Sequence, residues 1–103
     1  MRLTIVVVDD APDYRLIVRY VLAPLSDAVT IVGEAEDGEE GLTLVRRERP
    51  DIVITDLMMP RLNGLELTKC IKEECPQTKV ILITSYSDDA YQLRPSRAAL
   101  TPS

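Results

Sequence analysis

Three acidic residues stand where predicted strands end, and they are the clearest candidates for chemistry in this sequence. Asp9 and Asp10 directly follow an apolar run at residues 3–8, and Asp56 follows another run at residues 51–55. If these two strands are neighbours in a parallel sheet, their carboxyl ends bring three carboxylates into one cleft. Three negative charges at such range repel one another, and a divalent cation relieves the repulsion. Because the ligands are oxygens and the chain has no His, the sequence predicts Mg²⁺ or Mn²⁺ there and not zinc.

A hydroxyl group joins this acidic set on the same predicted edge. Thr84 directly follows an apolar run at residues 79–83. Each of the four residues also has an ordinary structural interpretation, because paired aspartates often cap turns or helices and a β-branched residue often ends a strand. Their joint position at the ends of predicted parallel strands favours a functional site.

Short apolar runs alternate with helix signals along the chain, and these elements must position the candidate site. The runs that predict strands are residues 3–8, 29–34, 51–55 and 79–83. The predicted helix starts are Pro12, which an apolar stripe follows as far as Leu25, the pair Asp37 and Glu40, the pair Asn63 and Glu66, and the group Ser87, Asp88 and Asp89. This alternation predicts an α/β fold with right-handed crossovers and a parallel sheet covered on both faces.

The composition is that of one small globular domain. The chain has 103 residues, of which 46% are hydrophobic, and 17 acidic against 12 basic residues give a net charge of −5. That balance argues against direct contact with nucleic acid, which needs a positive footprint. No apolar run could cross a membrane and no signal peptide opens the chain, so we expect a cytoplasmic location. Cys70 and Cys75, without any His, are expected to be free thiols.

The last ten residues depart from the pattern of the rest. Residues 94–103 hold two prolines, two basic residues and no acidic residue, and they show no strong apolar periodicity. A continuing strand and helix are not expected from such a composition. The sequence therefore predicts a domain over residues 1–93 and an irregular tail over residues 94–103.

Three strings in the chain resemble the receiver domain of two-component response regulators. They are VVVDD at the end of the first strand, DLMMPRLNG after the third and ILITS at the fourth. The resemblance runs from about Leu3 to Asp89, and DLMMPRLNG is its most specific part. It implies a flavodoxin-like fold, in which helices sandwich a parallel sheet of strand order 2-1-3-4.

The resemblance also implies a role for each candidate residue. Asp56 would be the phosphoacceptor, taking a phosphoryl group from a sensor histidine kinase or a phosphotransfer protein. Asp10 and Asp56 would bind Mg²⁺ together with the backbone carbonyl of Met58, and Asp9 would act through a bridging water. Thr84 would donate its hydroxyl to a phosphoryl oxygen. Phosphoryl transfer needs mainly positioning and charge neutralisation, so a signalling domain that is not itself an enzyme can accept the group without any His.

The carboxyl-terminal part of the sequence departs from the receiver pattern. A receiver continues to a fifth strand that carries a lysine followed by proline, and then to a fifth helix, whereas the last lysine here is Lys79. We therefore expect the fifth strand and helix to be missing, and the phosphoryl group to lack its ammonium partner. The strand at residues 79–83 would then be an open edge, which favours dimerisation or strand exchange with another chain.

Three other classes of function compete with a phosphoacceptor. A receiver-like interaction module that works without phosphorylation is favoured by the missing lysine and opposed by the intact acidic and hydroxyl set. A phosphatase of the haloacid dehalogenase type would need an aspartate two positions after the nucleophile, where Met58 stands. A flavin-binding domain is disfavoured because no hydroxyl-rich loop follows the first strand and the only aromatic residues are four tyrosines.

Overall fold

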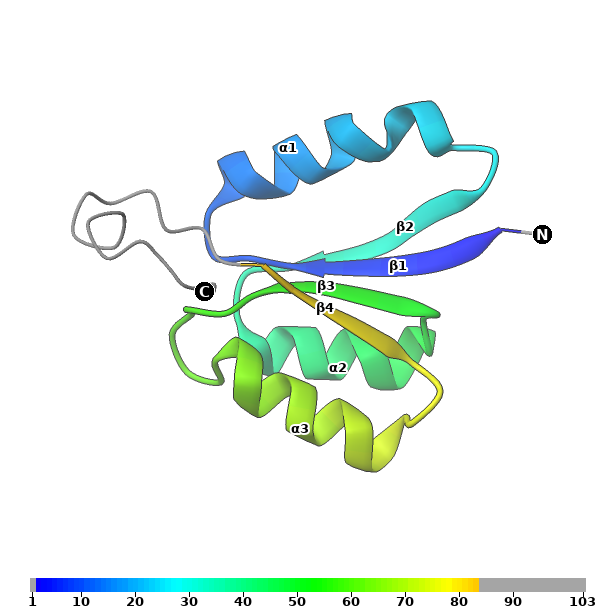
Figure 1. The fold of residues 1–103 in the computed structure, drawn as a ribbon. Coiled ribbons are helices and arrows are strands. Elements are labelled where there is room, and N and C mark those ends of the chain that lie inside the picture. Colours follow the sequence, from blue (N-terminus) through cyan, green and yellow to red (C-terminus); the bar gives the residue numbers. More distant parts are fainter. Residues whose placement is uncertain (1, 84–103) are drawn as a thin grey trace, which may run out of the picture.

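A parallel sheet lies between two layers of helices in the computed structural model, which describes residues 2–83 (Figure 1). The four strands have the order β2-β1-β3-β4, which confirms the predicted order. Helix α1 covers one face of the sheet, and α2 and α3 cover the other. The strands are β1 (Leu3–Val8), β2 (Val29–Ala35), β3 (Ile52–Asp56) and β4 (Lys79–Ile83), and the helices are α1 (Pro12–Leu22), a short 3-10 turn η1 (Ala23–Leu25), α2 (Gly38–Glu48) and α3 (Gly64–Glu74).

The strand boundaries agree with the predicted ones to within one residue. The main difference is at β3, which begins at Ile52 and includes Asp56, whereas the sequence predicts residues 51–55. Asp51 stays outside the strand because its side chain accepts hydrogen bonds from the backbone N–H of Thr4 at 2.8 Å and from the hydroxyl of Thr4 at 3.1 Å. This aspartate therefore ties the start of β3 to β1.

Two helices begin with the side-chain caps that the sequence predicts. The Asp37 carboxylate accepts a hydrogen bond from the backbone N–H of Glu40 at 2.8 Å. Asn63 and Glu66 form a reciprocal capping box, in which each side chain accepts a hydrogen bond from the other residue's backbone N–H. Such caps satisfy N–H groups that have no partner inside the helix. They fix where α2 and α3 start, and α3 follows the turn that leaves the acidic end of β3.

The hydrophobic core lies between the sheet and the layer of α2 and α3. Val6, Val45, Val53, Leu67 and Ile71 are each fully buried there. Burying side chains of this size contributes about 1.5–3 kcal/mol each to the stability of the fold. Cys75 is buried in the same core and Cys70 is partly buried, and both are free thiols, as predicted.

On the α1 side of the sheet, much apolar surface of the described residues stays exposed to water. This helix packs against β1 and β2, and none of its residues is fully buried. Ile17 and Val21, which belong to its predicted apolar stripe, are 52% and 61% exposed. One helix is too narrow to cover four strands, so the sheet is covered better on the side of α2 and α3 than on the side of α1.

Several predictions concern residues that lie outside the described part of the chain. These are the helix start at residues 87–89, the domain end at residue 93, the tail at residues 94–103, and the lack of a fifth strand and helix, and all of them stay predictions. Among residues 2–83, no helix has the length and apolar character needed to cross a membrane.

The unequal burial of the two helical layers predicts unequal costs of truncating their leucines. Replacing Leu67, which is fully buried, with Ala should lower the free energy of unfolding by about 2–5 kcal/mol, because it leaves a cavity in the core. The matched change Leu16→Ala, at a side chain 56% exposed on α1, should cost about 0.5 kcal/mol or less. Urea unfolding measures both, and equal losses would contradict a larger core on the side of α2 and α3.

Candidate acidic site at the carboxyl edge of the sheet

Three carboxylates gather where β1 and β3 end. The two strands are paired neighbours, and Val8 lies opposite Thr55 in their register. Asp9 follows β1 directly and Asp56 is the last residue of β3, so the register brings them side by side. One carboxylate oxygen from each of Asp9, Asp10 and Asp56 lies within 4.8 Å of the other two. The predicted meeting of these three side chains is confirmed.

The three carboxylates differ sharply in their exposure to water. Asp9 and Asp56 are each 1% exposed, whereas Asp10 is exposed. The Asp9 Oδ1 atom accepts a hydrogen bond from the backbone N–H of Ala11 at 2.9 Å. Its Oδ2 atom is buried and has no hydrogen-bond partner among the described residues. A buried carboxylate oxygen without a partner is costly, and here it lies in a cluster that a cation could enter.

Burial raises the pKa of Asp9 above its ordinary value. Loss of water around the carboxylate is the largest cause, and the negative charges of Asp56 and Asp10 act in the same direction. The hydrogen bond from Ala11 and the positive charge of Arg15 oppose the shift without cancelling it. In the absence of a cation, keeping Asp9 ionised in the folded chain therefore lowers the stability of the fold.

The turn after β3 is tied to the acidic cluster by backbone hydrogen bonds. The backbone N–H of Met58 donates to Asp56 Oδ1 at 3.3 Å. The N–H of Leu57 donates to the carbonyl of Ile83 at 2.8 Å, and the N–H of Gly64 donates to the carbonyl of Leu57 at 2.9 Å. A Cβ atom on Gly64 would collide with the backbone of Asp56 and Leu57. The glycine that starts α3 therefore permits the close approach that holds this turn in place.

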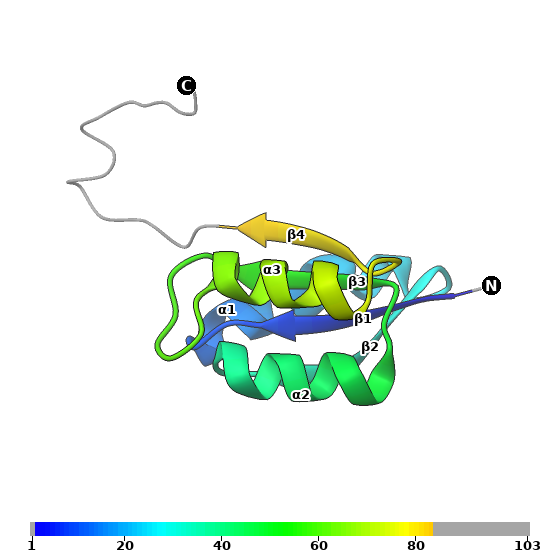
Figure 2. The same cartoon turned by 90° about the horizontal axis from the view of Figure 1, so that it is seen from below.

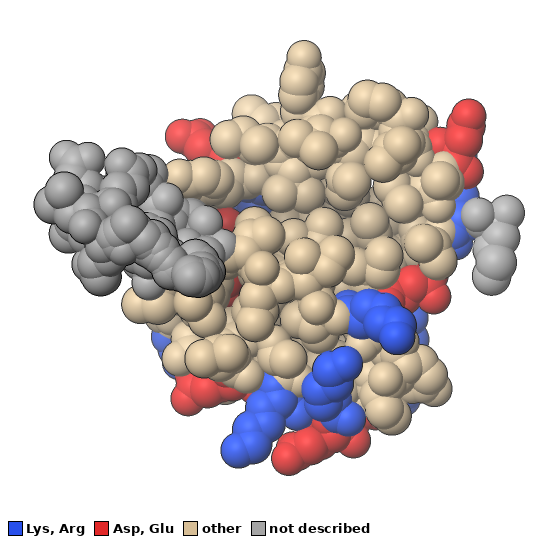
Figure 3. Space-filling model, in the orientation of Figure 1, with Lys and Arg blue, Asp and Glu red and all other residues tan. Residues whose placement is uncertain are grey.

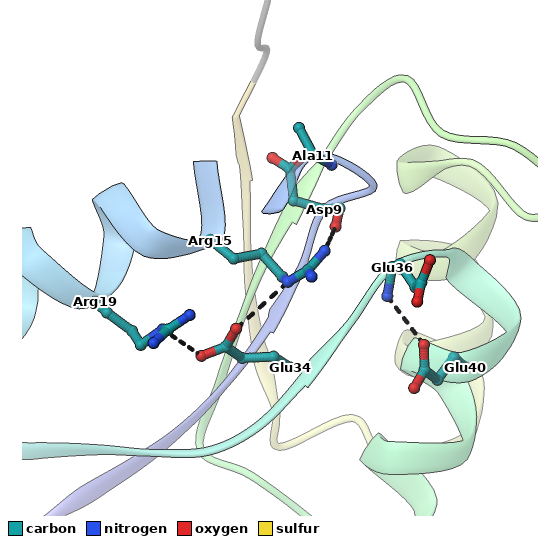
Figure 4. A network of polar contacts seen from close by, with 7 residues as sticks. All are labelled: Asp9, Ala11, Arg15, Arg19, Glu34, Glu36 and Glu40. Carbon is teal, nitrogen blue, oxygen red and sulfur yellow. Dashed lines mark hydrogen bonds and ion pairs between the residues drawn. The ribbon is translucent and has the colours of Figure 1, made fainter. Parts of the chain in front are cut away.

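Arg15 of α1 is a cationic side chain that lies beside the acidic cluster (Figure 4). Its guanidinium donates to the backbone carbonyl of Asp9 at 2.6 Å and pairs with Glu34 at 3.4 Å. Arg19 also pairs with Glu34, at 2.7 Å. The paired arginines therefore satisfy a carboxylate on β2 and hold the loop after β1, and no arginine forms an ion pair with Asp9 or Asp10 among residues 2–83.

Arg15 and Glu34 were not predicted as neighbours of the site. The sequence holds one weak signal for them, since Arg15 and Arg19 are four residues apart and so share one face of a helix. Nothing in the sequence indicates that Glu34 faces that helix, because the register of β1 and β2 shifts between Ile5 and Val6. The shift decides which β2 side chains lie under α1.

Two predicted site features remain untested by the geometry. Thr84 lies outside the described residues, although it directly follows β4, whose last residue Ile83 pairs with Asp56. Its predicted contact with a phosphoryl oxygen stays a prediction. Met58 lies in the turn beside Asp56, with its side chain 60% exposed, and a metal-binding role for its backbone carbonyl also stays a prediction.

The donor set fits a small, hard divalent cation. All of its side-chain donors are carboxylate oxygens, which suit Mg²⁺ or Mn²⁺ and not a metal that prefers nitrogen or sulfur. The buried Oδ2 of Asp9 offers an oxygen that lacks a hydrogen bond, and Asp10 keeps the cluster open to water. A cation placed among the three would offset both the repulsion and the unmet hydrogen-bonding capacity.

Sequence comparisons connect this site with a family. A family model described as the response regulator receiver domain matches residues 5–99. The uncharacterized transcriptional regulatory protein YxjL of Bacillus subtilis is 33% identical over 97 residues, which are 94% of this chain and 44% of YxjL. A protein-glutamate methylesterase/protein-glutamine glutaminase of Myxococcus xanthus is 42% identical over 99 residues, which are 95% of this chain and 27% of that protein. The chain thus spans less than half the length of these relatives.

Solved structures agree with the sequence comparisons. The signal receiver domain of NarL from Mycobacterium tuberculosis has a TM-score of 0.76 at 34% identity, covering 86% of this chain and 71% of that domain. The isolated REC domain of RcsB from Salmonella enterica, solved in the presence of the phosphomimetic BeF3⁻, has a TM-score of 0.77 at 28% identity, covering 87% of this chain and 67% of that one. These likenesses show the flavodoxin-like receiver fold.

The raised pKa of Asp9 predicts how stability changes with pH when no divalent cation is present. Below the ordinary aspartate pKa, both the folded and the unfolded chain keep the proton and this effect vanishes. As the pH rises, the unfolded chain loses its proton first, so native stability falls until the raised folded pKa is passed. In EDTA at pH 7, Asp9→Asn should therefore be more stable than the wild type, and the difference should disappear near pH 3.

Urea unfolding at the two pH values measures this difference. Asp27→Asn, which changes an exposed acidic residue before β2, is the control and should change stability little at either pH. An Asp9→Asn variant that is less stable than the wild type at pH 7 in EDTA would contradict an electrostatic cost at Asp9.

Proposed function

Because this chain belongs to the response regulator receiver family, we propose that it accepts a phosphoryl group on the Asp56 carboxylate. The donor is a phosphohistidine on a sensor histidine kinase or a phosphotransfer protein. Receiver domains are generally signalling modules and not enzymes in their own right, and they partner with histidine kinases. The observation that carries the proposal is the cluster of three carboxylates, two of them buried, with one buried oxygen that lacks a hydrogen bond.

The residues around Asp56 support a transfer that relies on positioning. An Asp56 Oδ atom attacks phosphorus, the new P–O bond forms as the P–N bond to the imidazole breaks, and the imidazole nitrogen takes the electron pair. The hydrogen bond from Met58 and the pairing of β3 with both neighbours hold the carboxylate in one orientation. Such a step needs alignment and charge neutralisation more than it needs a strong base.

Asp9, Asp10 and Asp56 would hold the Mg²⁺ that this transfer requires, with the backbone carbonyl of Met58 as a further ligand. Bound Mg²⁺ supplies neutralisation of the negative charge that builds up on the phosphoryl oxygens. Asp9 and Asp56 are buried, so they offer the ion fixed oxygens. Thr84 is proposed to donate its hydroxyl to a phosphoryl oxygen, since it follows the strand that pairs with the end of β3.

The proposed kinase partner also indicates the compartment in which we propose that the chain acts. A cytosolic kinase domain would meet this chain in the cytoplasm, and the net charge of −5 disfavours direct binding of nucleic acid. Transcriptional regulation and methylesterase activity are properties named for longer relatives. The chain covers less than half of those proteins, so neither activity is proposed for it.

One observation favours a second candidate, a receiver-like module that works without phosphorylation. All three lysines of the chain lie in α3 or at the start of β4. Lys79 pairs in register with Ile52, at the opposite end of the strands from Asp56. Lys79 is therefore not placed to contact a phosphoryl group on Asp56 of the same chain, which removes one source of charge stabilisation.

Phosphorylation of the chain by a small-molecule donor separates the two candidates. After incubation with Mg²⁺ and acetyl phosphate, intact-mass spectrometry should show a single phosphoryl adduct that Asp56→Asn abolishes. Asp27→Asn should keep the adduct, because Asp27 lies in the turn before β2, away from the acidic cluster. A folded wild-type chain that binds Mg²⁺ but never gains the adduct would refute the proposal and leave the module that works without phosphorylation.

A further inference from the structure

The outer side of β4 is an open sheet edge within the described part of the chain. Figure 2 shows β4 at the margin of the sheet, with β3 on its inner side. The N–H of Lys79 donates to Asp51 and the carbonyl of Ile83 accepts from Leu57, so these residues direct their backbone groups inward. Backbone direction alternates along a strand, and Val80 and Leu82 therefore direct their N–H and carbonyl groups outward. Such groups form a template for another strand.

The surface around this edge is apolar and nearly free of charge. The sequence of β4, KVILI, contains no acidic residue. Ile81 and Leu82 are 47% and 40% exposed, and Ile17 on α1 is 52% exposed. In Figure 3, the described surface between α1 and α3 is almost entirely uncharged, and the acidic and basic side chains lie around its margin. A chain of net charge −5 repels its own copies, and this is a surface where that repulsion is smallest.

A second copy of the chain fits this edge in one favoured register. A two-fold axis perpendicular to the sheet, midway between the Ile81 residues of the two copies, would pair two β4 strands antiparallel. Ile81 then faces Ile81 of the second copy, and Val80 lies opposite Leu82 of the second copy, so the outward backbone groups of both meet. All five residues of β4 are paired in this register, whereas a shift of two residues leaves some of them without a partner.

The same register makes the ends of the two strands complementary in charge. Antiparallel pairing places Lys79 of one copy opposite Ile83 of the other, and Ile83 is the residue that pairs with Asp56. The Cα atoms of Lys79 and Asp56 are then separated by two strand spacings, about 10 Å. A flexible lysine side chain and an aspartate can bridge that gap, and Lys79 is exposed, with no ion pair to any residue from 2 to 83.

We propose that two copies of this chain pair through β4, and that Lys79 of each copy contributes its ammonium group to the acidic site of the other. The pairing joins the two sheets and covers the β4 edge of each copy. It also brings Lys79, which lies at the opposite end of its own strands from Asp56, to the acidic site of the second copy. The effect on phosphoryl transfer rests on the proposed function of Asp56, whereas the pairing itself does not.

Sedimentation equilibrium of the full 103-residue chain tests the pairing. The wild type should show a concentration-dependent dimer. Ile81→Lys should be monomeric, because the two new charges would face each other across the axis. Leu25→Lys, at a site of similar exposure on η1, is the control and should stay dimeric. A wild type that stays monomeric at high concentration would overturn the proposal.

Zero-length cross-linking tests where Lys79 lies. A carbodiimide applied to an equal mixture of ¹⁴N- and ¹⁵N-labelled chains should join the peptide of Lys79 to a peptide of the acidic cluster with mixed labels. Within one copy these groups lie at opposite ends of the strands, so such a link has to come from two copies. Dimers in which Lys79 never links to Asp9, Asp10 or Asp56 would overturn the proposed register.

Mixing variants tests the contribution of Lys79 to phosphoryl transfer. Lys79→Ala should take up phosphate from acetyl phosphate about tenfold more slowly than the wild type, which corresponds to one charge-assisted hydrogen bond. Adding Asp56→Asn chains, which keep Lys79 but cannot accept the group, should restore uptake by the Lys79→Ala chains. An unchanged rate, or no restoration, would overturn the role of Lys79. A cross-linked dimer that gains no adduct at all would refute the proposed function of Asp56 and leave the pairing intact.

Discussion

Electrostatic repulsion among three carboxylates is the constraint on which the rest of this structure depends. The sheet order places β1 beside β3, and their register brings Asp9 and Asp56 together at 1% exposure each. A fold that brings like charges into a nearly dry position loses stability unless something compensates for them. Arg15 does not do so directly, since its side chain binds the Asp9 carbonyl and Glu34. The cost is consistent with a site kept for a cation and a phosphoryl group.

The two faces of the sheet are stabilised in different ways. The face under α2 and α3 carries the closely packed core, in which Leu67, Ile71 and Val53 are fully buried. The face under α1 buries Ile5 and Val7 of β1, but the apolar stripe of α1 itself stays largely exposed and ion pairs form there at Glu34. The acidic site lies at the carboxyl edge between these two layers. Asp56, at the end of β3, is its buried part, and Asp10, in the loop after β1, is its exposed part.

The strands could be predicted from the sequence because their β-branched runs are short and end at charged or turn-forming residues. The starts of α2 and α3 could be predicted because Asp37 and Asn63 have glutamates three residues later, and both caps formed. The meeting of Asp9 and Asp56 needed the strand order as well, which came from the resemblance to receiver domains. The role of Asp51 at the start of β3 and the pairing of Arg15 with Glu34 depend on register, and no local pattern in the sequence encodes register.

We infer that Asp9, Asp10 and Asp56 form a site for a hard divalent cation. Paramagnetic broadening by Mn²⁺ tests it most directly, because the ion broadens the amide resonances of nearby residues. Substoichiometric Mn²⁺ should erase the amide signals of Asp9, Asp10 and Asp56 first, and excess Mg²⁺ should restore them. The signal of Glu48, an acidic residue at the far end of α2, should persist. Broadening that is spread over all acidic residues, or that spares the cluster, would contradict the claim.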